Sequence, residues 1–166
     1  MVGAKLYYPD DTIQHAGVVV GLGGVAAHVL CKLPRDAEGY MGRLRCVQEI
    51  SAVTAACMMV KTSVFKAVGG FDEELKVAFN DIDLCMKVRK YGVKIVFTPY
   101  AELYHYESKS RGMEDTPEKQ LRFSREVNCF RRKWERELLK GDPYYNPNLT
   151  LNNTDCSLRK QEKNGD

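Results

Sequence analysis

The sequence predicts an α/β domain in which helices flank a mixed sheet. Three observations predict it: apolar, β-branched runs of strand length, other segments with apolar residues at helical spacing, and glycine or proline between them. The chain has 166 residues, of which 44% are hydrophobic, and this suits one globular domain with a core. A wholly disordered or fibrous chain is therefore excluded.

Charge and cysteine content exclude several classes of function. The formal net charge of +3 at pH 7 is too small to indicate a nucleic acid partner. The six cysteines are scattered, so neither a zinc ribbon nor a disulfide scaffold is expected. No signal region begins the chain, and no apolar run approaches the roughly 20 residues of a spanning helix. We expect a soluble, cytoplasmic protein, with at most peripheral contact at the inner face of the membrane.

The first fifty residues are expected to form a hairpin followed by two loops. Residues 4–8 and 12–20 read as its strands, and His15 reads as a structural histidine because no second ligand stands at metal-like spacing. The glycines of residues 21–24 match no phosphate-binding pattern, so a flexible loop is expected there. Residues 34–45 are polar and glycine-rich, which predicts a mobile loop of the kind that forms lids.

The middle of the chain predicts strand, helix, helix and strand in that order. Residues 52–60 form a nearly continuous apolar run, expected as a strand that is buried on both faces. Residues 63–68 predict a short helix that Gly69 and Gly70 end. A second helix is expected from Asn80 to Gly92, and a strand over 93–98 that Pro99 closes.

Two carboxylates, Asp81 and Asp83, stand at the expected start of the second helix. Unpaired backbone N–H groups and the positive end of the helix dipole favour carboxylates at this place. Asp83 lies three residues after Asn80, where a capping box would return its side chain to the Asn80 amide. Because a purely structural cap needs the same residues, the pair alone does not decide between structure and function.

The C-terminal third combines a dense polar loop with a long amphipathic helix. Residues 100–112 hold aromatic, histidine, lysine and arginine side chains, and Thr116 with Pro117 marks a helix start. The apolar stripe of that helix is Phe123, Val127, Phe130, Trp134 and Leu138. Its basic face reads either as a solvated face or as a contact for an anionic membrane. Residues 141–166 are expected to be an extended, partly disordered polar tail.

Several of these segments, in this order, resemble the C-terminal half of a family 2 glycosyltransferase of the bacterial O-antigen or rhamnan type. They are residues 54–61, 68–72, 80–85 and 91–95, together with His105 and residues 108–112, and the resemblance spans roughly Gly3 to Asn148. The resemblance implies the GT-A fold, a Rossmann-like sheet that binds a nucleotide-diphosphate sugar. Residues 1–140 would then be its C-terminal part, with an incomplete mixed sheet flanked by helices.

The resemblance also implies roles for particular residues. Asp81 matches the general base of an inverting displacement, and Ser108, Lys109 and Arg111 match a loop that neutralises the donor diphosphate. His105 matches a histidine that, in metal-dependent members, helps to hold a divalent cation, Mn or Mg, or the donor diphosphate. The acceptor and supporting positions are Asp83, Asn80, Thr54, Ala55 and Cys57.

The sequence also departs from the family pattern. Asn80 stands where many relatives carry Glu, and the family's nucleotide-binding half and its Asp-x-Asp motif precede the part that is matched here. We therefore expect a fragment that is inactive by itself. The alternatives are a non-catalytic module that binds a saccharide or a partner, with a homodimer formed through exposed sheet edges, and an acid-capped α/β domain without a site.

Overall fold

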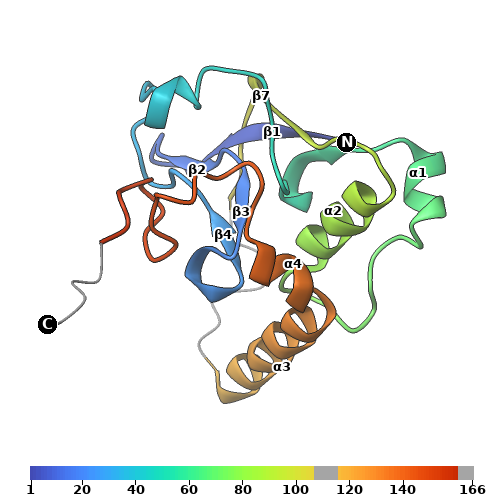
Figure 1. Cartoon of the computed structure of the whole chain (residues 1–166). Coiled ribbons are helices and arrows are strands. Elements are labelled where there is room, and N and C mark those ends of the chain that lie inside the picture. Colours follow the sequence, from blue (N-terminus) through green and yellow to red (C-terminus); the bar gives the residue numbers. More distant parts are fainter. Residues whose placement is uncertain (107–115, 161–166) are drawn as a thin grey trace, which may run out of the picture.

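The computed structural model describes residues 1–106 and 116–160, which form a mixed α/β fold (Figure 1). The main sheet has the strand order β2-β1-β7-β5, and the short strand β6 pairs with β1 beside β2. Its strands are β1 (Val2–Tyr7), β2 (Ile13–His15), β5 (Gln48–Glu49), β6 (Met58–Met59) and β7 (Val96–Tyr104). A mixed sheet flanked by helices was predicted, and at this level the prediction is confirmed.

Strand β1 is the centre of this sheet. It runs parallel to β7 and antiparallel to β2 and β6. The predicted hairpin is present as β1 and β2, but its second strand is shorter than expected. The rest of that apolar run forms β3 (Val18–Val20), which pairs with β4 (Ala26–His28) in a separate two-stranded sheet. The short 3₁₀ helix Leu22–Gly24 connects these two strands.

The predicted end of β7 at Pro99 was wrong, because the strand continues to Tyr104. The pairing with β1 steps from Ala4↔Thr98 to Lys5↔Glu102, so residues 99–101 have no counterparts in β1. Proline lacks the N–H that a sheet ladder needs, and a bulge is where a strand accommodates it. The proline therefore causes an irregularity instead of an end.

The predicted buried strand over residues 52–60 was also wrong. Ala52 and Val53 are buried, but the chain then turns through the 3₁₀ helix Ala55–Cys57 before it enters the partly exposed strand β6. The Thr54 hydroxyl accepts from the Ala56 amide at 3.3 Å, a local bond that competes with strand pairing. Val53 lies against β1, where a Cβ on Gly3 would come 2.4 Å from Val53 Cγ1.

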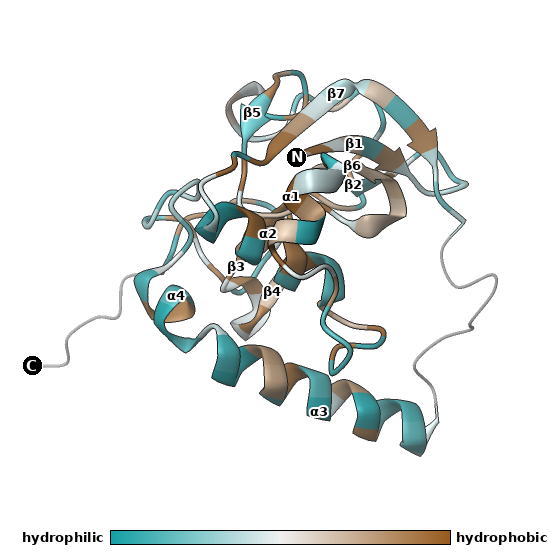
Figure 2. Ribbon diagram, turned by 90° about the vertical axis from the view of Figure 1, so that its right-hand side faces the viewer, coloured by the Kyte–Doolittle hydropathy of each residue, from teal (hydrophilic) through white to brown (hydrophobic). Residues whose placement is uncertain are grey.

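The helices are α1 (Thr62–Ala67), α2 (Asn80–Lys90), α3 (Pro117–Lys133) and α4 (Glu135–Lys140). Helix α2 lies between the main sheet and α3, and both views show this arrangement (Figures 1 and 2). The predicted end of α1 before Gly69 is confirmed. The predicted start of α3 at Thr116 is also confirmed, because the Thr116 hydroxyl accepts from the Lys119 amide at 3.4 Å. The expected long helix is broken at Trp134, whose φ of −115° and ψ of 22° are not helical.

The buried ends of the predicted apolar stripe hold α3 on the core. Phe130 and Trp134 are buried, whereas Phe123 is 41% exposed near the N-terminal end of α3. The core that they join includes Leu84 and Val88 of α2 and Phe97 of β7. The stripe therefore packs as predicted over its second half.

The predicted capping box is absent. Phe79 occupies the N-cap position of α2 and no side chain caps the helix. Asp83 is instead fully buried, and Trp134 Nε1 donates to its Oδ1 at 2.8 Å. Lys133 Nζ lies 2.8 Å from Oδ1 and Lys87 Nζ lies 3.3 Å from Oδ2. The carboxylate therefore joins α2 to the junction of α3 and α4.

The segment after α4 has no helix or named strand up to residue 160, as expected of an extended segment, but it packs on the core. Asp142 Oδ2 accepts from the Val20 amide at 2.8 Å, which fixes the start of the segment. Tyr145, Leu149 and Cys156 are buried. The expected disorder is therefore wrong for residues 142–158; the domain boundary at residue 140 stays a prediction.

Across residues 1–106 and 116–160, every helix is too short or too polar to cross a membrane.

We predict that Asp83→Asn lowers the free energy of unfolding by about 2–4 kcal/mol, because it removes the buried carboxylate that pairs with Lys87 and one of the two carboxylates that pair with Lys133. Urea denaturation followed by circular dichroism measures this change. The matched control is Glu135→Gln, which alters an exposed carboxylate on α4 and should change the free energy by less than about 0.5 kcal/mol. Equal stabilities of Asp83→Asn and the wild type would contradict the role given to Asp83.

Candidate functional site

Asp81 lies half-buried in the first turn of α2. Its Oδ2 accepts from the Ala55 amide at 3.0 Å, and its Oδ1 accepts from the Ile82 amide at 2.9 Å. The first of these bonds ties α2 to the 54–57 turn. The structure therefore brings together Asp81, Ala55 and the neighbouring Thr54 and Cys57 of the predicted site.

The chain enters α2 through an unusual backbone conformation. Phe79 has a φ of 64° and a ψ of 3°, in the left-handed region that costs a non-glycine residue about 1–2 kcal/mol. The centroid of its ring lies 5.4 Å from that of Phe130 and 5.7 Å from that of Phe123, and both of these residues are on α3. These contacts offset the backbone cost, and the left-handed residue sets the direction in which Asn80 and Asp81 leave the preceding loop.

Glu126 of α3 fixes that preceding loop. Its side chain is 3% exposed, and its two oxygens accept from the amides of Val77 at 3.1 Å and Ala78 at 3.0 Å. The Arg122 guanidinium lies 3.7 Å from the same carboxylate. Sequence reasoning missed Glu126, although a glutamate four residues before the buried Phe130 stands on the apolar side of an amphipathic helix and is a detectable signal.

Two histidines support the 54–57 turn from the sheet side. His15 Nε2 accepts from the Thr54 amide at 3.4 Å, and His15 Nδ1 lies 3.0 Å from His28 Nδ1. A neutral His15 that accepts at Nε2 carries its hydrogen on Nδ1, so it donates to His28. His15 is fully buried, and burial together with the nearby His28 lowers its pKa well below the ordinary 6.5. The structural role predicted for His15 agrees with these contacts.

His105 lies just past the carboxyl end of β7. Its amide donates to the Tyr7 carbonyl at 3.0 Å, and its Nδ1 lies 2.8 Å from Gln14 Oε1. The Gln14 amide nitrogen donates to the His105 carbonyl at 3.2 Å, so the residue is held twice by β2. The predicted diphosphate-binding residues that follow it in the sequence, Ser108, Lys109 and Arg111, lie outside the described residues.

The described residues do not form a complete metal site. Within residues 1–106 and 116–160, no group of three or more histidine, cysteine, aspartate or glutamate side chains is placed to hold a metal ion. One ring nitrogen of His105, Nδ1, lies against the side-chain amide oxygen of Gln14. The divalent cation implied by the resemblance therefore stays a prediction.

The remaining predicted site residues divide by exposure. Asn80 begins α2 and is half-buried, and Cys57 ends the 3₁₀ turn with the same exposure. Asp83 is fully enclosed, so its side chain supports the start of α2 from within the core. Contacts of these three residues with an acceptor stay predictions.

The 34–45 loop is anchored across the carboxyl ends of β1 and β7. Arg35 pairs with Glu102 at 2.6 Å and with Asp11 at 3.4 Å. Its guanidinium carbon lies 4.6 Å from the Tyr7 ring centroid, and Leu44 is buried. The predicted loop is therefore held near its start by Arg35 and near its end by Leu44. Its role as a lid stays a prediction.

No family model and no solved structure matches the chain. It is 59% identical over 158 residues, 95% of its own length, to the uncharacterized protein y4gI of Sinorhizobium fredii. It is 39% identical over 166 residues, 99% of its length, to the O-antigen biosynthesis protein RfbC of Myxococcus xanthus. The chain spans only 17% and 13% of the lengths of these two proteins.

A third relative matches a shorter part of the chain. Over 62 residues, or 37% of this chain and 20% of the other protein, the chain is 36% identical to an N-acetylglucosaminyl-diphospho-decaprenol L-rhamnosyltransferase of Mycobacterium tuberculosis. This relative is named as a rhamnosyltransferase, and RfbC is named as a protein of O-antigen biosynthesis. The finer family assignment and the GT-A fold stay proposals.

We predict that the free energy of unfolding falls as the pH drops below 6.5, because unfolded His15 takes up a proton that the buried ring rejects. His15 contributes a slope of up to about 1.4 kcal/mol per pH unit between its folded and unfolded pKa values. Urea denaturation between pH 5 and pH 8, in steps of about one unit, measures this slope. His15→Gln keeps an acceptor for Thr54 and should flatten the dependence; a wild-type slope in His15→Gln would contradict the assignment.

Proposed function

We propose that this chain carries the catalytic base and the acceptor side of an inverting glycosyltransferase for cell-surface polysaccharide synthesis. The donor in this proposal is a nucleotide-diphosphate sugar, and the acceptor is a glycan or a lipid-linked glycan. The observation that carries the proposal is the placement of Asp81, half-buried at the start of α2 and tied to the 54–57 turn. The names of the relatives support it independently.

Asp81 has the chemical properties that the role of base requires. A carboxylate offers about four lone-pair sites, and the two backbone amides occupy two of them. The remaining sites can accept the proton of an acceptor hydroxyl as its oxygen attacks C1 of the donor sugar. The positive end of the α2 dipole lies beside Asp81 and favours negative charge there. Departure of the nucleoside diphosphate from the opposite face would invert the anomeric carbon.

The structure supplies a rigid frame for that carboxylate. Glu126 holds the two amides before Phe79, the α3 aromatic rings pack against Phe79, and Asp83 is fixed from within the core. A base that is positioned before the reaction needs little reorganisation in the transition state. We infer that α3 positions Asp81 and that the 54–57 turn forms the wall beside the acceptor hydroxyl.

The donor side of the proposal rests on His105 and the residues after it. Lys109, Arg111 and Ser108 follow β7 in the sequence and supply cationic and hydroxyl groups suited to a diphosphate. A bound Mn or Mg ion would neutralise charge on the leaving diphosphate. The homodimer, the membrane contact and the inactivity of the isolated chain belong to the same set of predictions.

We predict that Asp81→Asn lowers the rate of glycosyl transfer by at least about 100-fold, because general base catalysis contributes about 10²–10⁴-fold. Transfer is measured on the natural polypeptide that contains this sequence, with UDP-, dTDP- and GDP-sugars in the presence and absence of manganese. The control Glu73→Gln alters an exposed carboxylate in the turn that precedes α2 and should retain the wild-type rate. Full activity in Asp81→Asn would refute the assignment of the base.

A further inference from the structure

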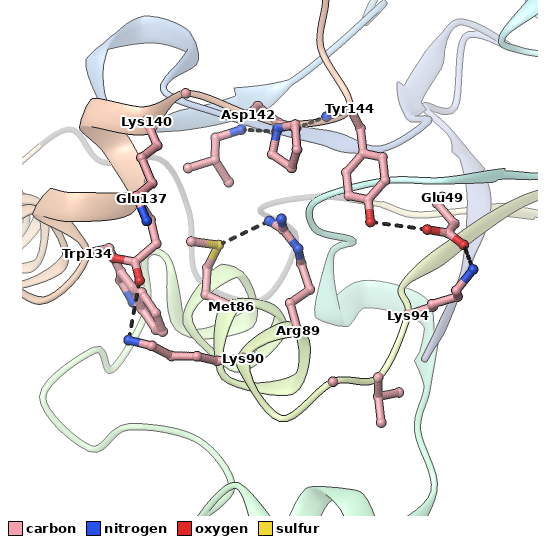
Figure 3. Close-up of a pocket in the computed structure, with 15 residues that line it drawn as sticks. Glu49, Met86, Arg89, Lys90, Lys94, Trp134, Glu137, Lys140, Asp142 and Tyr144 are labelled. Atoms are coloured by element: carbon pink, nitrogen blue, oxygen red, sulfur yellow. Dashed lines mark hydrogen bonds and ion pairs between the residues drawn. The ribbon is translucent and has the colours of Figure 1, made fainter.

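A cavity of about 560 Å³ lies at the C-terminal end of α2 (Figure 3). Arg89 lies in the last turn of α2 and Asp81 in the first, so they are separated by about 12 Å along the helix axis. The volume falls within the range of about 300–1,000 Å³ that small-molecule sites occupy. The cavity is therefore of ligand size and separate from the proposed base.

The walls of the cavity combine apolar surface with charged groups. Val20, Met86, Val93 and Pro143 supply apolar surface, and α4 with the segment 141–144 closes one side. Sites for small organic molecules have this composition: mostly apolar walls with a few polar groups that fix orientation.

Each acidic group around the cavity already has a partner. Glu137 pairs with Lys90 at 3.3 Å, and Glu49 pairs with Lys94. Asp142 accepts from the amide of Val20 at 2.8 Å and from that of Tyr144 at 2.9 Å. Two of these three carboxylates therefore pair with lysines, and the third, Asp142, is hydrogen-bonded to backbone amides.

Two cations of the cavity wall, Arg89 and Lys140, have no such carboxylate partner among the described residues. In the part of the chain that the structure describes, no carboxylate lies within ion-pair distance of Arg89 or Lys140. Arg89 Nη1 donates to the Ser51 hydroxyl at 3.0 Å and approaches Met86 Sδ at 3.7 Å, and its guanidinium carbon lies 5.3 Å from the Tyr144 ring centroid. These contacts occupy one nitrogen of a guanidinium with five N–H donors.

The Arg89 guanidinium lies among the groups that line the cavity. Figure 3 shows Arg89 reaching in from α2 while Tyr144 extends from the opposite wall. The Tyr144 hydroxyl donates to Glu49 Oε2 at 3.1 Å, so this ring is held in place. An arginine that is fixed by a buried hydroxyl and an aromatic ring is pre-organised for a planar oxyanion.

The end of α2 does not oppose an anion as strongly as a free helix C-terminus would. The carbonyl of Lys87 accepts from the Tyr91 amide at 2.9 Å, and that of Arg89 accepts from the Gly92 amide at 2.9 Å. The Val88 carbonyl accepts from the Val93 amide at 3.1 Å. These bonds complete the C-terminal turn and reduce the partial negative charge that faces the cavity.

We propose that this cavity binds a small organic anion through its phosphate or carboxylate group. Arg89 is the side chain that holds the oxyanion, Lys140 is the second cation, and the apolar walls contact the uncharged part of the molecule. The proposal does not depend on the role given to Asp81.

Isothermal titration calorimetry at low ionic strength tests the proposal with glucose 1-phosphate and glucuronate, and with glucose and inorganic phosphate as controls. Either sugar anion is expected to bind, and neutral glucose is not. Arg89→Met should weaken binding about tenfold or more, and Lys140→Gln about threefold. Arg125→Gln removes the same charge from an exposed position on α3 outside the cavity, and its affinity should stay within about twofold of the wild type.

Because Arg89→Met also leaves the buried Ser51 hydroxyl without its donor, circular dichroism checks its fold, and the exposed Lys140→Gln provides the second variant. The proposal is overturned if neither sugar anion binds at about 10 mM, or if both cavity variants bind like the wild type. Binding of inorganic phosphate as tight as that of glucose 1-phosphate would show an adventitious ion only, and would also overturn it.

Discussion

The proposed site depends on the contacts by which α3 and Trp134 hold the start of α2 and the loop before it. Glu126 takes two amide bonds from the loop before Phe79, and Trp134 donates to the buried Asp83 two residues after Asp81. These contacts bracket Asp81 from both sides. Burying two carboxylates is costly unless their oxygens are bonded, and here the bonds join segments that are 48 and 51 residues apart. The same contacts therefore stabilise the fold and position the carboxylate.

The second constraint comes from the sheet. Val53 packs where β1 has only Gly3, and His15 on β2 accepts from the Thr54 amide. The turn that follows carries the Ala55 amide to Asp81. Within the apolar run over residues 52–60, Ala52 and Val53 therefore belong to the core. The residues from Thr54 onward form the turn beside Asp81.

Much of the fold could be predicted from the sequence, because local signals decided it. Gly69, Gly92, Thr116 and Pro117 mark helix ends that the structure places where they were expected. The failures came where tertiary contacts override local patterns. Asp83 fits a capping box by spacing, yet the indole of Trp134 takes its carboxylate into the core. The apolar run 52–60 could not reveal that its second half turns away from the sheet.

The site was predicted in part for the same reason. Asp81 and Ala55 were named from ordered motifs, and the structure joins them. Glu126 belongs to none of these motifs. Its role depends on a hydrogen bond from the Val77 amide, which lies 49 residues earlier in the sequence. Arg89 lies in a cavity formed by segments from β3 to residue 144, which no single stretch of sequence displays.

The most direct test of the account is a structure of the natural polypeptide that contains this sequence, with a nucleoside diphosphate and an acceptor glycan bound. The account predicts that an Asp81 carboxylate oxygen lies within about 2.6–3.2 Å of the acceptor hydroxyl, with α3 still holding the start of α2. An acceptor bound elsewhere, with Asp81 contacting only the Ala55 and Ile82 amides, would contradict it.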